Sequence, residues 1–249
     1  MSIKTKLKPP CWLGIDVHKD FLQLALIDRK GNLEVFSYSG SFNSLDKLLA
    51  RLKVSAIAID APSQPAKGII KKPWLRVRLG LKENKWQDLR ICEYLLGLGG
   101  FYWTRSQKDL CSEWMQVGFA LYRFFQERGY RLASSEQKGN LIEVFPSYAY
   151  QFLLAPKKLE KKTSASGKKQ RGEVLKRFVK ISRAQLNPHS LDAILSSLIA
   201  RFYQTGEYPC YWLGEPEEGQ ILFPGKILPP IAKKLPKDLK KKWVAQIRA

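Results

Sequence analysis

The chain has 249 residues, of which 45% are hydrophobic and 12% aromatic, and this composition excludes a disordered protein. Its 43 Lys and Arg residues against 22 Asp and Glu give a net charge of +21, which predicts attraction to polyanions, with nucleic acid ahead of an anionic membrane surface. The alternative interpretation is a basic surface that only keeps the protein soluble. The charge does not distinguish DNA from RNA, and no pattern indicates a protein partner.

The termini and the cysteines indicate a reducing compartment and no membrane. The first ten residues are basic but lack the apolar segment of a signal peptide, and no apolar stretch approaches the roughly 20 residues that span a bilayer. We therefore expect a cytoplasmic protein. Four cysteines, far apart and without zinc-ribbon spacing, are expected to be buried free thiols: Cys11, Cys92, Cys111 and Cys210.

The segment Trp12 to Asp16 predicts a short apolar strand with a carboxylate at its end. Two further β-rich runs follow, Phe21 to Ile27 and Leu33 to Tyr38. The turn between them contains Gly31-Asn32, and this arrangement predicts a hairpin.

A helix and a second strand ending in an acid come next. Ser44 is a candidate N-cap for a helix with leucines at helical spacing, and residues 55 to 60 form an apolar run that ends at Asp60, before Pro62. A helix between two strands of one sheet makes those strands parallel. Asp16 and Asp60 should then emerge at the same edge of the sheet, outside the carboxyl ends of the strands, where α/β proteins bind ligands.

Residues 63 to 87 mix basic and aromatic side chains, a combination suited to phosphate attraction and base stacking. The alternative is a solvated loop with two packing tryptophans, Trp74 and Trp86. The candidate nucleic-acid-binding residues of this segment are Lys71, Lys72, Arg76 and Arg78.

Two helices and a strand are expected in the middle of the chain. The helices cover about Asp88–Leu96 and about Asp109–Glu127, the second with Ser106 as a possible cap, and the strand covers Asn140–Pro146. The strand contains Glu143 within an apolar run. Because an ionised carboxylate is costly to bury without a partner, Glu143 is either a surface residue at the sheet edge or a third metal ligand.

The last third of the chain begins with a basic segment from residue 157 to 183. Small polar residues at 163–167 predict a flexible loop, and a helix is expected from Gly172 to Ile181. A final helix, Leu191 to about Gln204, carries Asp192 on its apolar face. A metal already held by Asp16 and Asp60 would be a partner for this acid, and the alternative is a first-turn Asp that stabilises the helix N-terminus. Residues 1–225 are expected to form one domain and residues 226–249 a basic C-terminal appendage, partly ordered at best.

Four acids therefore stand at strand ends or on an apolar helix face. Mg²⁺ and Mn²⁺ prefer oxygen ligands, and two such ions about 3.5–4 Å apart can drive phosphodiester cleavage. The candidate catalytic and metal-binding residues are Asp16, Asp60, Glu143 and Asp192.

Several ordered motifs carry a resemblance to a known family. They are Gly14-Ile15-Asp16, Ile59-Asp60-Ala61-Pro62, Arg90-x-x-Glu93, Glu143-Val144-Phe145-Pro146, Lys169-x-Arg171-Gly172, Leu191-Asp192-Ala193 and Glu218-Gly219-x-Ile221. Over about residues 11 to 225 the chain resembles the DUF429 family of predicted nucleases. The resemblance implies an α/β, ribonuclease H-like fold with a mixed five-stranded sheet flanked by helices. It also implies that the four acids bind metal and that Arg90, Lys169 and Arg171 contact phosphate.

The segment Val17-His18-Lys19 departs from the DUF429 pattern. The string Gly14-Ile15-Asp16-Val17-His18-Lys19 instead resembles the start of transposases with a resolvase-like Asp-Glu-Asp-Asp domain, and His189-x-x-Asp192-Ala193 is similar to Holliday-junction resolvases. Three hypotheses about the function of the protein remain open. The first is a metal-dependent nuclease, including a resolvase- or transposase-like enzyme, and the second is a non-catalytic nucleic-acid-binding protein. The third is an ATP-using enzyme of the actin and sugar-kinase type, which is disfavoured because no Gly-rich turn follows Asp16 or Asp60.

Overall fold

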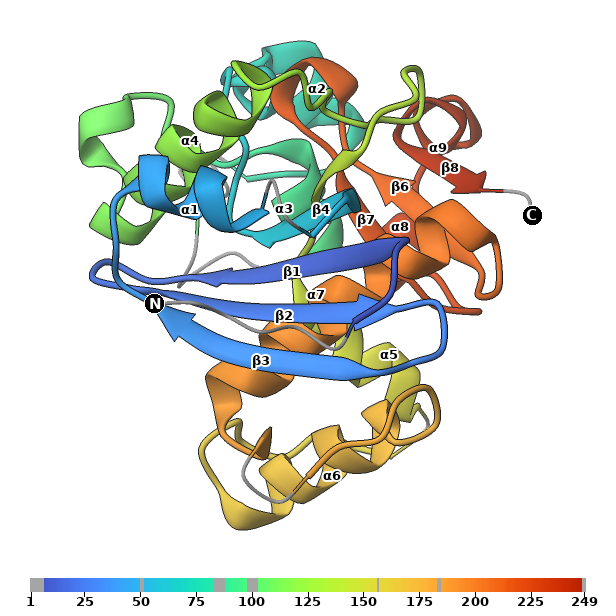
Figure 1. Ribbon diagram of the computed structural model, residues 1–249. Helices are drawn as coiled ribbons and strands as arrows, with labels where there is room; N and C mark the ends of the chain where they lie inside the picture. The colour runs from blue at the N-terminus through green and yellow to red at the C-terminus, as the bar shows by residue number, and fades with distance from the viewer. Residues whose placement is uncertain are drawn as a thin grey trace.

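The centre of the fold is a mixed five-stranded sheet in the order β3-β2-β1-β4-β5 (Figure 1). The computed structural model describes residues 7–49, 52–82, 88–97, 103–155, 157–182 and 185–247. β1, β4 and β5 are parallel, and β2 runs antiparallel to both β1 and β3. The mixed sheet that we expected is therefore present. Its strands are β1 (Cys11–Val17), β2 (Leu22–Asp28), β3 (Leu33–Tyr38), β4 (Val54–Asp60) and β5 (Leu141–Glu143).

The expected hairpin joins β2 and β3 through a turn whose geometry the sequence explains. Gly31 has a φ of 78°, a left-handed conformation that glycine adopts without strain. The Asp28 carboxylate closes the turn, because it accepts hydrogen bonds from the backbone N–H groups of Lys30 and Asn32 at 2.9 Å.

Helices cover both faces of the sheet, and the alternation of side chains along β1 shows why. Leu13 and Ile15 pack in one buried cluster with residues of α1 (Phe42–Leu49) and α4 (Glu113–Gln126). Trp12 packs in the other cluster, with residues of α7 (Pro188–Thr205). Since β1 is buried along its whole length, it reads as a continuous apolar run.

Several helices begin elsewhere than expected. α1 starts before Ser44, so this residue is not its N-cap, and α4 follows Ser112 and not Ser106. The first turn of each helix is the least certain part of a sequence prediction, because caps are set by local backbone geometry. Other helical elements that precede the C-terminal segment are η1 (Ile69–Lys71), α2 (Pro73–Arg78), α3 (Ile91–Leu96), η2 (Lys108–Leu110), α5 (Pro146–Leu154), α6 (Ala165–Leu175) and η4 (Pro216–Glu218).

We expected a flexible loop at residues 163–167. This expectation is wrong for the second half of the segment, because α6 begins at Ala165. Ser164 caps this helix, and its side chain accepts a hydrogen bond from the Gly167 backbone N–H at 3.0 Å. A Cβ on Gly167 would lie 2.0 Å from the carbonyl oxygen of Lys161, so this turn packs against the helix where only glycine fits.

The C-terminal segment is ordered up to Ile247, which corrects the expectation that it is partly ordered at best. β8 (Val244–Ile247) pairs with β6 (Cys210–Leu213) in a second antiparallel sheet of order β7-β6-β8, in which β7 is Ile221–Pro224. α8 (Pro230–Lys234) and α9 (Lys237–Trp243) precede β8, and Trp243 is buried in the main core. The apolar residues of the C-terminal segment, which are interspersed with lysines, pack into the main core and hold the segment against the rest of the protein. The boundary at residue 225 stays a prediction.

A candidate metal centre

Asp16 and Asp60 form the base of the site, at the carboxyl edge of the sheet. They are direct partners in the parallel pairing of β1 and β4. Residues at the same level of a parallel pair point to the same face, so both carboxylates project toward α7. Asp16 is 4% exposed, and Asp60 is partly buried.

Asp192 completes a carboxylate triad from the side of α7. One oxygen atom from each of the residues Asp16, Asp60 and Asp192 lies within 4.8 Å of the other two. The approach of α7 depends on Gly14, because a Cβ there would lie 2.1 Å from the Ala193 carbonyl oxygen. Asn187 caps α7 and places Asp192 beyond its first turn, so the interaction with the helix N-terminus does not explain this acid.

The surroundings of Asp192 are only partly complementary to it. Its Oδ2 accepts hydrogen bonds from the Lys162 ammonium and, at 3.2 Å, from the Ser147 hydroxyl. Its Oδ1 is buried and has no hydrogen-bond partner among the described residues. A buried carboxylate oxygen without a donor costs free energy, and a cation between the three acids would satisfy it.

Two histidines also converge on Asp16. Its Oδ2 lies 2.7 Å from His18 Nε2 and 3.2 Å from His189 Nδ1. The His18 ring stacks on Phe21 with 4.4 Å between ring centroids. One atom from each of Asp16, His18 and His189 lies within 4.8 Å of the other two, so Asp16 belongs to two clusters that could hold a metal ion.

The three acids differ in how readily they ionise. Burial raises the pKa of Asp60 well above its usual value, and the charges of Asp16 and Asp192 add to this. Burial also raises the pKa of Asp192, against the opposing effect of Lys162. Burial opposes ionisation of Asp16 too, but hydrogen bonds with His18 and His189 lower its pKa below the usual value. A divalent cation would offset the repulsion among these carboxylates.

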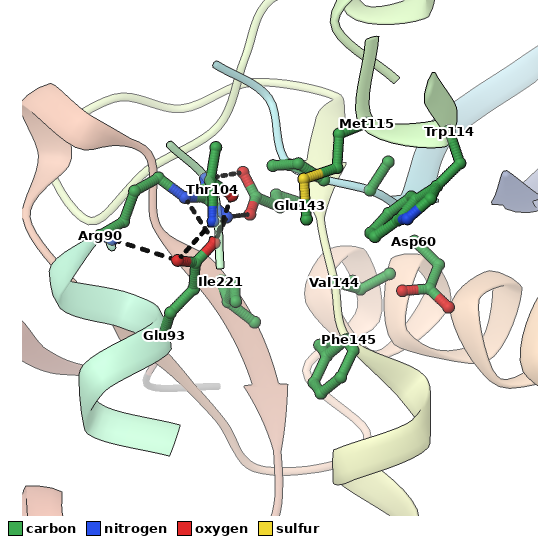
Figure 2. A pocket seen from close by; sticks show the side chains of 12 residues that line it. Asp60, Arg90, Glu93, Thr104, Trp114, Met115, Glu143, Val144, Phe145 and Ile221 are labelled. Carbon is green, nitrogen blue, oxygen red and sulfur yellow. Dashed lines mark hydrogen bonds and ion pairs between the residues drawn. The ribbon is translucent and has the colours of Figure 1, made fainter. Parts of the chain in front are cut away.

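Glu143, the fourth predicted acid, lies on the other face of the sheet. It is in register with Ile59, one residue before Asp60, and side chains alternate between faces along a strand. Its oxygens accept from Arg90 Nη1 at 2.9 Å and Nη2 at 2.6 Å, and both residues are buried. Figure 2 shows the carboxylates of Asp60 and Glu143 directed away from each other. The structure therefore does not bring Glu143 into the triad.

Arg90, predicted to contact phosphate, is 2% exposed and belongs to a buried network that joins four segments of the chain (Figure 2). Besides Glu143, it pairs with Glu93, which accepts from the Thr104 backbone N–H at 3.1 Å. Glu218 accepts from the backbone N–H groups of Lys67, Ile69 and Ile91, which fixes this part of the chain beside the network. With its guanidinium enclosed by carboxylates, Arg90 is not available to a phosphate in this structure.

Of the other predicted phosphate-binding residues, some already bond to other groups of the protein and others are exposed. Arg171 is 4% exposed and donates to the carbonyl oxygens of Glu160 and Gly167, so it supports α6 from inside. Arg78 forms two hydrogen bonds with Asp238, and Lys71 pairs with Asp88 at 3.0 Å. Arg76 donates to the Lys82 carbonyl oxygen. Lys72 and Lys169 are exposed. Trp86 lies outside the described residues.

A pocket of about 410 Å³ opens over the acids. Asp16, Asp60, His18 and Lys162 line it, together with the aromatic side chains of Trp114 and Phe145. The pocket thus combines carboxylates, the His18 imidazole and the side chains of Lys19 and Lys162 with the aromatic surfaces of Trp114 and Phe145.

Lys162 and the two histidines were not among the predicted site residues. The chain has only two histidines, and they lie two residues after Asp16 and three before Asp192. That spacing was a usable signal, because residues two apart on a strand share a face, as do residues three apart on a helix. Nothing singles out Lys162 within a segment rich in lysine.

The sheet order, the strand directions and the acids at its carboxyl edge define an α/β protein of the ribonuclease H-like class, as expected. The family described as "Protein of unknown function (DUF429)" matches residues 103–218, which confirms the predicted resemblance to that family over this part of the chain. No curated protein matches the chain significantly.

Two solved structures of Thermus thermophilus RuvC are similar to the chain. One is RuvC in complex with a Holliday junction substrate, at 13% identity and a TM-score of 0.41; the other is RuvC, at 14% identity and a TM-score of 0.38. Each match covers 79% of this chain and 96% of the RuvC chain. Among the described residues, no helix is long and apolar enough to cross a membrane.

Proposed function

We propose that this protein is a metal-dependent nuclease that hydrolyses phosphodiester bonds of nucleic acid. The observation that carries the proposal is the convergence of Asp16, Asp60 and Asp192, together with the buried Oδ1 of Asp192, which has no hydrogen-bond partner among the described residues. Oxygen atoms of this kind are the ligands that Mg²⁺ and Mn²⁺ prefer, so the donor set fits the cation that the fold class implies. When bound, such a cation activates water and stabilises charge on the leaving oxygen.

The residues of the chain have separate parts in this proposal. The three aspartates hold the cation, and the Ser147 hydroxyl and the Lys162 ammonium orient Asp192. Lys162 also lines the pocket, where its charge favours an incoming phosphate. Trp114 and Phe145 provide surfaces on which a nucleotide base can stack beside the acids.

The net charge of +21 supports nucleic acid as the substrate class, because a basic surface offsets the repulsion between phosphate and a carboxylate cluster. A resolvase- or transposase-like activity on branched DNA falls within this proposal. The second candidate is a non-catalytic nucleic-acid-binding protein, and the ammonium of Lys162 against Asp192 favours it, since a fixed cation already neutralises part of the cluster.

A cleavage assay separates the two candidates. The protein is incubated with labelled single-stranded DNA, single-stranded RNA, duplex, hybrid and branched substrates, in Mg²⁺, Mn²⁺ or EDTA. We expect cleavage of at least one substrate with metal, none in EDTA, and none with Asp16→Asn. Asp20→Asn, which removes an exposed acid four residues away, is the matched control and should cleave normally. Salt-sensitive binding without cleavage under any of these conditions would contradict the nuclease and favour the binding protein.

A further inference from the structure

The only two histidines of the chain, 171 residues apart in the sequence, meet at a single carboxylate oxygen. We infer that His18, His189 and Asp16 form a second cation site, distinct in chemistry from the all-oxygen triad and suited to a divalent transition metal such as Zn²⁺ or Co²⁺. The catalytic part of this inference rests on the proposed function, whereas the binding of the ion does not.

The distances between the donor atoms fit one ion. Ligands bound tetrahedrally to zinc at about 2.0–2.2 Å lie about 3.3–3.6 Å from one another. Asp16 Oδ2 is 2.7 Å from His18 Nε2 and 3.2 Å from His189 Nδ1, and all three atoms lie within 4.8 Å of each other. Small side-chain adjustments are enough to place an ion between them.

The donor set decides which ions the site favours. Two imidazole nitrogens and one carboxylate oxygen are the protein ligands of several catalytic zinc sites, which keep another position open. Mg²⁺ strongly prefers oxygen, whereas imidazole suits transition metals. The histidine site should therefore bind transition metals in preference to Mg²⁺. The triad of Asp16, Asp60 and Asp192 offers only oxygen ligands and should bind Mg²⁺ without the histidines.

The surroundings hold the rings while leaving the site accessible. His18 is stacked on Phe21, and the ring of His189 meets that of His18 edge-on, with 4.2 Å between centroids. Such packing fixes the orientation of metal-ligating imidazoles. The side chains of His18 and His189 are 25% and 43% exposed, so an ion can enter from solvent and keep water as a further ligand.

Asp16 is common to both sites. Its Oδ2 contacts the two histidines, and its carboxylate also belongs to the triad with Asp60 and Asp192. A carboxylate shared in this way couples two ions at the short separation typical of two-metal hydrolases. A mixed pair, with a transition metal on the histidine side, is the arrangement that these donors favour.

The test uses full-length protein without nucleic acid and follows the imidazole NMR signals, which come from only two residues. One equivalent of Zn²⁺ should shift the signals of both histidines far more than one equivalent of Mg²⁺, which affects the imidazoles only through the shared carboxylate of Asp16. Zn²⁺ that shifts neither imidazole, or only one, would overturn the inference.

Variants assign the site by direct titration with Co²⁺. His18→Gln and His189→Gln should each weaken Co²⁺ binding by about 10- to 100-fold or more, the range already seen when groups that only support a ligand are removed. Asp60→Asn should retain histidine-dependent Co²⁺ binding, and the exposed Asp20→Asn is the charge control. If either histidine variant fails to fold, the NMR titration of the unmodified protein still decides. Histidine variants that bind Co²⁺ as tightly as the unmodified protein would refute the site.

The metal titrations, together with the cleavage assay, separate the histidine site from the nuclease activity. Histidine-dependent Zn²⁺ and Co²⁺ binding by a protein that cleaves no substrate would leave the site standing and remove the nuclease. Cleavage with Mg²⁺, together with Co²⁺ affinity that is unchanged in both histidine variants, would support the nuclease and refute the histidine site.

Discussion

Asp16 and Asp60 are direct partners across the parallel strands β1 and β4, and this register places two carboxylates on the same face of the sheet, facing Asp192. The arrangement concentrates negative charge, which raises the pKa of Asp60 through burial and through its two neighbours.

Asp60→Asn should stabilise the metal-free protein near neutral pH. A pKa raised by folding means that the contribution of Asp60 to stability is full below its unfolded value and is lost as the pH rises through the folded value. Removing the charge should raise the free energy of unfolding by on the order of 1 kcal/mol. Denaturant unfolding at several pH values measures this. The variant should show a flatter pH dependence and little stabilisation by Mn²⁺, and a less stable variant would contradict the prediction.

Lys162→Met should tighten divalent-cation binding while destabilising the metal-free protein. Its ammonium pairs with Asp192, and the charges of Asp192, Asp16 and Asp60 raise its pKa against the effect of burial. Losing the pair should cost about 2 kcal/mol, less than a fully buried pair because the side chain is 31% exposed. Titration with Mn²⁺ and thermal unfolding measure both effects. Lys161→Met, an exposed neighbour, is the control, and weaker Mn²⁺ binding by Lys162→Met would show that the ammonium assists the ion.

Gly14→Ala should disrupt the site through the backbone. The added methyl group would meet the Ala193 carbonyl oxygen and push α7, with Asp192, away from β1. Forcing a side chain into a filled core costs about 1–3 kcal/mol, and the loss of geometry should also weaken cation-dependent stabilisation. Gly225→Ala is the control, because its Cβ would come no closer than 3.3 Å to a neighbour. Unchanged unfolding and cation binding would show that β1 and α7 can separate freely.

Glu143→Gln distinguishes a structural acid from a metal ligand. Breaking the buried pair leaves the Arg90 guanidinium incompletely compensated, so the free energy of unfolding should fall by about 3 kcal/mol. Cation affinity of the folded protein should be unchanged, because Glu143 points to the opposite face of the sheet. Calorimetric titration with Mn²⁺ well below the unfolding temperature checks this. Loss of affinity without loss of stability would restore Glu143 as a ligand.

Lys169→Ala should weaken nucleic-acid binding more than Arg78→Ala. Both changes remove one positive charge, but the guanidinium of Arg78 is held by Asp238, whereas Lys169 is exposed. Removing one phosphate contact should reduce the slope of log affinity against log salt by about 1. Binding to duplex DNA at several salt concentrations measures the slope. Equal effects of the two changes would show that only total charge matters.

The sequence alone was sufficient to predict the first four strands of the main sheet and the convergence of Asp16, Asp60 and Asp192. β1, β2, β3 and β4 are short apolar runs bounded by turn residues, and such runs carry their own signal. Asp16 and Asp60 lie at the carboxyl ends of β1 and β4, which run parallel although β2, β3 and α1 lie between them in the chain, and the order of the predicted elements indicated that they share an edge. Asp192 stands out because an acid on an apolar helix face requires a partner. The free, buried state of the four cysteines was predicted in the same way and is confirmed within the described residues.

The tertiary structure decided what depends on register and on long-range packing. A single-residue offset between β4 and β5 turns Glu143 away from Asp60 and toward Arg90, and no local pattern encodes that offset. The packing of β8 against β6 likewise depends on strands more than thirty residues apart in the chain. Lys162 became recognisable only when the turn before α6 placed its ammonium against Asp192. Side-chain chemistry marked the acids, but the partners of each charge were set by which elements the folded chain brings together.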